Sequence, residues 1–153
     1  MIIEKKLAEM GLSLPPPSAP VGTYIGAVQV GNLLFVSGHG PRRYGDVITS
    51  GKVGTDLTLE QAYDTAKSVM LNMLGTVKTS LGDLDRVERI VKLLGMVNVG
   101  PGFNQTPAVI NGASDLLVAL YGEKGRHARS AVGMAALPND IPVEIEMILQ
   151  VKE

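Results

Sequence analysis

Apolar residues recur every three or four positions between residues 59 and 81, a spacing that places them on one face of a helix. Thr58 and Gln61 have the spacing of a capping box at the start of this helix. A second helix is predicted to begin at Thr106-Pro107, a cap followed by proline at the first helical position, and to end at Gly122. The hydrophobic pattern therefore predicts two long helices.

Strand patterns surround these helices. The predicted strands are residues 24–30, 33–37, 87–99, 129–135 and 142–151. Gly31-Asn32 is a tight-turn signal between the first two strands, and residues 137–140 form a turn between the last two. The order β-β-α-β-α-β-β indicates one mixed β-sheet with two helices packed on one face, an α+β domain.

The ends of the pattern suggest additions to this sheet. Ile3, Leu7 and Met10 have helical spacing, so residues 2–10 are predicted to form a short helix. We expect one domain over residues 1–153, in which residues 1–20 supply this helix and a proline-rich linker. The segment 38–54 holds five glycines and the pair Arg42-Arg43, and we interpret it as a long loop of the kind that often carries function.

The strand at 87–99 and the last strand carry more apolar residues than one helix-covered face needs. This favours self-association through the other face of the sheet. In the last strand, Glu144 and Glu146 alternate with apolar residues and are therefore expected on one common face. A hairpin turn at 138–139 would set Arg129 opposite Ile148, roughly 13 Å along the strand from Glu144, with space for a small ligand between them.

Composition removes several classes of function. The chain has no cysteine, which excludes a disulfide framework, a thiolate zinc site and a cysteine nucleophile. His39 and His127 are the two histidines, and neither belongs to a cluster with metal-ligand spacing, so we expect no metal. Phosphate-binding glycine loops and serine-hydrolase motifs are absent from the sequence. No apolar run approaches the roughly 20 residues of a membrane span, and the charged first segment does not resemble a signal peptide, so we expect a cytoplasmic protein.

Three segments carry a family resemblance: VGNLLFVSGHGP, LGDLDRVERIVKLL and RSAVGMAALPNDIPVEIEMI. They resemble the Rid (reactive intermediate deaminase, or YjgF) family over most of the chain from about Tyr24 onward. The resemblance implies a chorismate-mutase-like fold assembled as a homotrimer, with small imino, enamino or 2-oxo acids bound in clefts between subunits. Enzymes of this family hydrolyse 2-aminoacrylate, 2-iminobutyrate and related imines to 2-oxo acids and ammonia, and they use no cofactor.

The resemblance also implies roles for individual residues. Arg129 matches the arginine that holds the substrate carboxylate, a task suited to its two parallel donors and permanent charge. Glu144 matches the glutamate that activates the attacking water as a general base. Tyr24 and Gly38 match residues that border the substrate, and Asn111 matches an asparagine that supports the site.

Some positions depart from the familiar family pattern. Ala131 stands where many members have cysteine, and we expect its backbone carbonyl to supply the contact there. His39 stands where the familiar deaminases often have glutamine, and we interpret it as a neutral polar substitute. The N-terminal helix and the stretch 98–105 look longer than in compact members, which indicates a divergent subgroup.

Two other functions compete with deamination. One is a regulatory trimer that binds small carboxylates without turnover, although the presence of Arg129 favours the enzyme. The other is RNA binding or endoribonuclease activity. A net charge of −1, four tyrosines and two phenylalanines offer little basic surface and few stacking aromatics, so the composition argues against a nucleic-acid partner.

Overall fold

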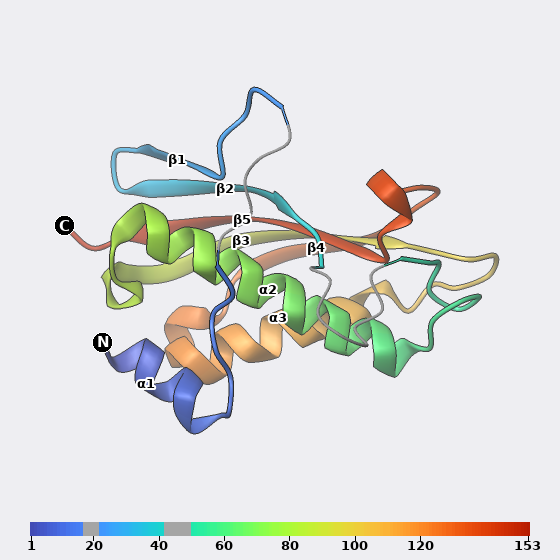
Figure 1. Ribbon diagram of the computed structural model, residues 1–153, viewed down its shortest axis with the longest axis horizontal. Coiled ribbons are helices and arrows are strands. Elements are labelled where there is room, and N and C mark those ends of the chain that lie inside the picture. Colours follow the sequence, from blue (N-terminus) through green and yellow to red (C-terminus); the bar gives the residue numbers. More distant parts are fainter. Residues whose placement is uncertain (17–21, 42–49) are drawn as a thin grey trace.

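The computed structural model describes residues 1–16, 22–41 and 50–153 and arranges them around one sheet (Figure 1). Its α-helices are α1 Ile2–Glu9, α2 Leu59–Leu81 and α3 Thr106–Tyr121, and its 3-10 turns are η1 Leu84–Arg86, η2 Gly122–Gly125 and η3 Pro138–Asp140. Its strands are β1 Ala27–Val30, β2 Leu33–His39, β3 Val87–Asn98, β4 Ala128–Met134 and β5 Val143–Val151. The predicted α+β class and element order are confirmed, including the short N-terminal helix.

The five strands lie in the order β1-β2-β5-β3-β4. β3 and β4 are parallel, whereas the other neighbouring pairs are antiparallel. Figure 1 shows the three helices together on one side of the sheet. The helix-facing residues of β5 are buried, and Glu144 and Glu146 alternate with them, so both glutamates face the opposite side as predicted. We call that opposite side the open face.

The predicted hairpin of the last two strands is wrong, because β3 runs between β4 and β5. The chain leaves β3, returns through α3 and adds β4 in parallel, as a crossover helix requires. The next connection then carries it past the end of β3 to the other side of that strand, and Asn139 and Asp140 both take positive φ there, at 54° and 56°. Asn98, fully buried at the end of β3, holds this connection by donating to the Asp140 carboxylate over 2.8 Å.

Local signals set the helix starts in two different ways. At α2 both hydrogen bonds of the predicted capping box form between Thr58 and Gln61. At α3 the predicted cap is wrong, because Gln105 occupies the cap position and Thr106 begins the helix. The Thr106 hydroxyl donates instead to the Ala131 carbonyl of β4 over 3.0 Å. This hydroxyl therefore ties α3 to the sheet edge rather than capping its own helix.

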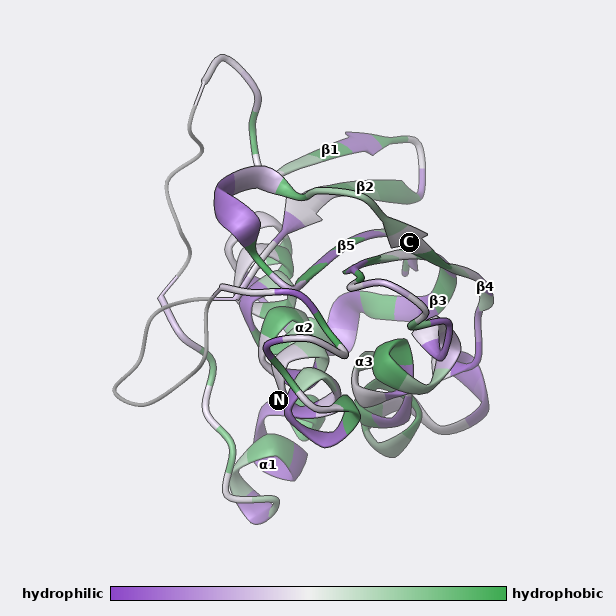
Figure 2. Ribbon diagram, turned by 90° about the vertical axis from the view of Figure 1, so that its right-hand side faces the viewer, coloured by the Kyte–Doolittle hydropathy of each residue, from purple (hydrophilic) through white to green (hydrophobic). Residues whose placement is uncertain are grey.

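The core lies between the helices and the sheet, and α3 contributes buried apolar residues to it. Figure 2 shows hydrophobic residues on α3. The two long helices cross closely at Gly112 of α3. A Cβ atom built there would collide with the backbone carbonyl of Tyr63 in α2, so only glycine fits at this crossing. The close crossing sets the position of the α3 face that carries Asn111.

Gly112→Ala should destabilise the protein by about 1–3 kcal/mol, because the added methyl group meets backbone that cannot rotate away. Val118→Ala on the exposed side of the same helix is the matched control and should change stability by about 0.5 kcal/mol or less. Chemical denaturation of both variants measures the difference. Equal stability of the Gly112 variant and the wild type would mean that the helices separate easily at this point.

Candidate functional site

Arg129 lies on β4, the strand at one edge of the sheet, and its side chain turns toward α3. Its Nη1 atom donates to Asn111 Oδ1 over 2.8 Å and to Ser114 Oγ over 3.1 Å. Within the described residues, its Nε and Nη2 atoms make no hydrogen bond or ion pair. These two atoms form the edge of a guanidinium that grips a carboxylate with two parallel bonds. The guanidinium is thus anchored through Nη1, whereas its Nε–Nη2 edge is available to a ligand.

A histidine extends this contact away from the arginine. His127 Nε2 lies 2.9 Å from Ser114 Oγ, and His127 Nδ1 lies 2.7 Å from the Gly125 carbonyl oxygen. Burial lowers the pKa of His127, and the positive charge of Arg129 lowers it further, against the opposing effect of the Gly125 hydrogen bond. The lowered pKa favours the neutral form of the imidazole.

The sequence analysis did not assign roles to Ser114 and His127. Ser114 follows Asn111 by three residues, so the two share a face of α3. His127 precedes Arg129 by two residues in extended chain, so the two share a face there. These two spacings could have identified Ser114 and His127 from the sequence, although neither spacing alone points to a site.

Glu144 lies on β5, on the open face, next to Gly38 of β2. A Cβ atom at position 38 would collide with Glu144 Oε2, so the glycine makes room for the carboxylate as well as bordering it. Burial raises the pKa of Glu144, and the nearby negative charge of Glu146 adds to the effect. Glu146 is exposed, whereas Glu144 is partly buried. The structure therefore distinguishes the two glutamates by environment.

Arg129 and Glu144 do not meet within one chain. On β3, Leu93 pairs with Arg129 and Met96 pairs with Glu144. Two strand spacings and three residues along β3 separate their backbones by roughly 14 Å, and an odd number of residues places them on opposite sheet faces. The expectation that one small ligand bridges the pair across a hairpin is therefore wrong for a single chain.

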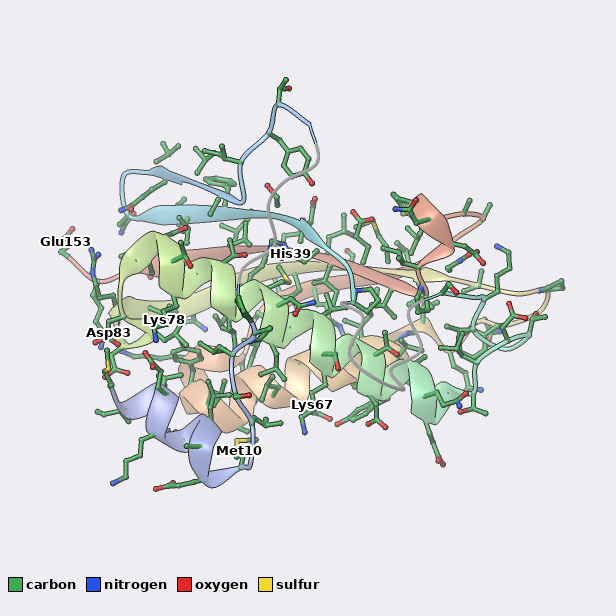
Figure 3. All side chains as sticks on the ribbon, in the orientation of Figure 1. Met10, His39, Lys67, Lys78, Asp83 and Glu153 are labelled. Atoms are coloured by element: carbon green, nitrogen blue, oxygen red, sulfur yellow. The ribbon has the colours of Figure 1, made fainter. Side chains whose placement is uncertain are left out.

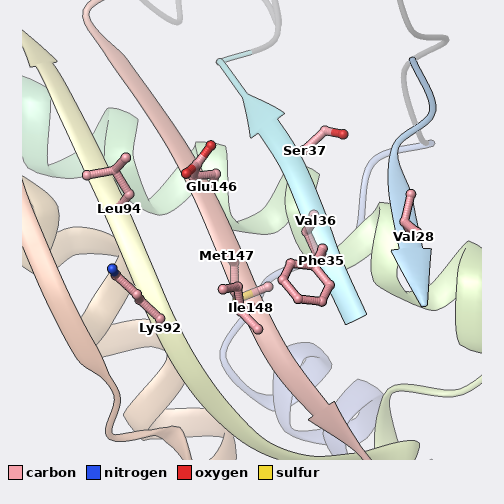
Figure 4. A pocket seen from close by; sticks show the side chains of 9 residues that line it. All are labelled: Val28, Phe35, Val36, Ser37, Lys92, Leu94, Glu146, Met147 and Ile148. Atoms are coloured by element: carbon pink, nitrogen blue, oxygen red, sulfur yellow. The ribbon is translucent and has the colours of Figure 1, made fainter. Parts of the chain in front are cut away.

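The open face of the sheet is apolar and hollowed. A hollow of about 290 Å³ is formed by side chains from four neighbouring strands, among them Phe35, Leu94, Glu146 and Ile148 (Figure 4). On β1 and β2, Val30 is 63% exposed and Phe35 42% exposed. β3 and β5, for which the apolar excess was predicted, place Leu94 and Ile148 in this hollow beside the charged Lys92 and Glu146.

The other expected site residues lie at different places. Tyr24 precedes β1 instead of belonging to it and is more than half exposed. Ala131 lies on β4 two residues after Arg129, with its carbonyl oxygen bonded to Thr106. His39 reaches the helix layer, where Nε2 lies 2.8 Å from Thr76 Oγ1 of α2 (Figure 3). It is therefore on the opposite sheet face from Glu144. Arg42 and Arg43 lie outside the described residues.

Two further features concern ions and membranes. Residues 1–16, 22–41 and 50–153 contain no group of three acidic or histidine side chains placed to hold a metal ion. In the same part of the chain, none of the helices has the length and apolar character needed to cross a bilayer.

Comparisons with known proteins agree with this fold. Residues 4–145 match the family described as YjgF/chorismate mutase-like, putative endoribonuclease. Protein TCP17 of Trypanosoma cruzi is 38% identical over 149 residues, covering 97% of this chain and 93% of that protein. A protein of Dermatophagoides farinae named 2-iminobutanoate/2-iminopropanoate deaminase is 28% identical, covering 92% of this chain and 95% of that protein.

A solved structure extends the likeness to three dimensions. The crystal structure of Atu1372, a protein of unknown function from Agrobacterium tumefaciens, matches with a TM-score of 0.89 and 41% sequence identity. The match covers 99% of this chain and 93% of that one. Together with the family match over nearly the whole sequence, these similarities establish that the chain belongs to the YjgF (Rid) family.

Proposed function

We propose that this protein hydrolyses small 2-imino acids and their enamine tautomers, of the 2-aminoacrylate and 2-iminobutyrate class, to 2-oxo acids and ammonia. The observation that carries the proposal is the open Nε–Nη2 edge of Arg129, a carboxylate-binding fork whose opposite end is anchored on α3. The relative from Dermatophagoides farinae, which is named 2-iminobutanoate/2-iminopropanoate deaminase, supports the same substrate class.

Arg129 binds the substrate carboxylate in this proposal. A guanidinium presents two parallel donors to a carboxylate, and its charge persists at any physiological pH. Asn111 supports the arginine directly by accepting from Nη1. The Ala131 carbonyl oxygen lies on the same strand, and its second lone pair is available to a donor on the substrate while the first accepts from Thr106.

Glu144 is the proposed general base. Its carboxylate takes a proton from water as the water oxygen bonds to the imine carbon C2. Glu144 returns this proton to the imine nitrogen, which gives a carbinolamine with a hydroxyl and an amino group on C2. The hydroxyl proton then passes through Glu144 to the nitrogen as the C2–N bond breaks and C=O forms, so that the 2-oxo acid and ammonia are released. A raised pKa suits this role, because a base acts best when its pKa lies near the working pH. Gly38 and Tyr24 border the reacting atoms.

The site is proposed to lie between copies of the chain in a homotrimer. Arg129 and Glu144 lie on opposite faces of one sheet, so a substrate that uses both must take each residue from a different copy. The apolar open face offers the surface through which copies associate, since large exposed patches of this kind mark interaction sites. The placement of Arg129 and Glu144 on opposite faces and the exposed apolar residues of the open face both support the proposed homotrimer.

Replacing Glu144 by Gln should abolish most imine hydrolysis, because the amide cannot take up a proton. Glu146→Gln is the matched control on the same strand and face and should retain activity. The wild-type rate should fall as pH decreases through the pKa of Glu144, because only the carboxylate accepts the proton. The raised pKa places this acid limb above the ordinary glutamate range. A coupled assay in which a dehydratase generates 2-iminobutyrate in situ measures all three rates, and similar small losses in both variants would refute the assignment of the base.

Replacing Arg129 by Ala should weaken substrate binding roughly tenfold to a hundredfold, through loss of a charge-assisted bidentate contact. Misplacement of the imine carbon relative to its water should reduce the turnover rate as well. Arg129→Lys keeps the charge but lacks the planar fork, so it should recover little. The exposed neighbour Arg126 supplies the matched control as Arg126→Ala, which should behave as wild type.

The melting temperatures of these arginine variants are measured together with their rates, to separate loss of activity from loss of the fold. The deaminase proposal fails if Arg129→Ala retains full activity. If activity and fold disappear together, Arg129 has a structural role instead.

A further inference from the structure

The contacts behind Arg129 form a chain of hydrogen bonds with one allowed direction. The Gly125 carbonyl oxygen can only accept, so His127 Nδ1 must carry the ring proton of the neutral imidazole. His127 Nε2 is then bare and accepts from the Ser114 hydroxyl, 2.9 Å away. Because the serine proton is used there, the Ser114 oxygen presents lone pairs to Arg129 Nη1 at 3.1 Å.

We propose that Ser114 and His127 are positioning residues that fix the guanidinium of Arg129 through this chain of bonds and thereby set the affinity of the site for carboxylates. The inference rests on the proposed function for its ligand. Neither residue touches the substrate in this arrangement, since both lie on the Nη1 side of the arginine, away from the open edge.

The geometry explains why two supporting residues are needed. Nη1 has two hydrogens, and Asn111 Oδ1 and Ser114 Oγ each accept one of them. Both bonds form together only when the guanidinium plane has one orientation, which leaves Nε and Nη2 directed at the ligand. A free arginine must lose rotamer entropy to bind, so an arginine ordered beforehand binds more tightly.

His127 determines the state of the serine. A serine hydroxyl rotates freely and can turn its proton toward the arginine, where a donor would face another donor. An acceptor at 2.9 Å holds that proton on the far side. Three elements surround the imidazole with identified groups: Ser114 from α3, the Gly125 carbonyl from η2, and Arg129, the charged group, from β4. The lowered pKa of His127 favours the neutral ring that this role requires.

The first test measures binding of 2-oxobutyrate, the stable product of 2-iminobutyrate hydrolysis, by calorimetry on the full-length protein. Ser114→Ala and His127→Ala should each weaken binding roughly threefold to tenfold. Each variant loses one hydrogen bond of the chain, so the side chain of Arg129 becomes less ordered. His127→Gln should recover most of the affinity, because its amide can both donate to Gly125 and accept from Ser114. Ser80→Ala, at an exposed serine of α2, is the matched control and should bind as wild type.

The second test needs no ligand. Nitrogen-15 spectra of the wild-type imidazole should show that His127 Nδ1 carries the proton and that Nε2 is bare. A proton on Nε2 would overturn the proposed chain directly, because Ser114 would then face two donors.

The outcomes separate this inference from the proposed function. If Arg129→Ala loses binding while the Ser114 and His127 variants bind as tightly as wild type, the positioning role is wrong and the proposed function stands. If the wild type itself does not bind 2-oxobutyrate, both are wrong. Weaker binding in both alanine variants, with recovery by glutamine and unchanged melting temperatures, supports the positioning role.

Discussion

The position of β3 between β4 and β5 is the constraint on which this account depends. It places Arg129 and Glu144 on strands that are not neighbours and on opposite faces of the sheet. Opposite charges that lie close together neutralise each other's reactivity by forming an ion pair. Here, the groups that shift the pKa of Glu144 are its own burial and Glu146, and Arg129 is not among them. In the proposed mechanism, this separation leaves Arg129 available to the substrate carboxylate and Glu144 available to water.

The same constraint gives the sheet edge and the open face distinct tasks. At the edge, α3 approaches β4 closely, with Thr106 bonded to the Ala131 carbonyl and Asn111 bonded to Arg129. The close helix crossing at Gly112 fixes α3 against α2. On the open face, the glycine at position 38 makes room for the carboxylate of Glu144. Backbone packing thus prepares each half of the proposed site separately.

Local patterns predicted much of this structure because they report local physics. The capping box at Thr58, the alternation in β5 and the helix end at Gly122 each depend on residues a few positions apart. The hairpin prediction failed because a turn signal at 137–140 says where the chain reverses but not which strand lies alongside. That pairing depends on α3 returning the chain in parallel to β3, which is a property of the whole fold. Likewise, the place of His39 beside Thr76 required the packing of a strand against a helix 37 residues away.

The proposed division of the site between copies is tested most directly by mixing two inactive variants. Arg129→Ala and Glu144→Gln are co-expressed with different tags, and hetero-oligomers are isolated and assayed for imine hydrolysis. If each cleft takes its arginine from one copy and its glutamate from the next, every isolated heterotrimer contains one intact cleft out of three, whichever variant is present twice. Activity near that fraction of the wild-type rate is the predicted result. Activity no greater than that of either variant alone, in isolated hetero-oligomers, would contradict the account, because it would place both residues of each site in a single chain.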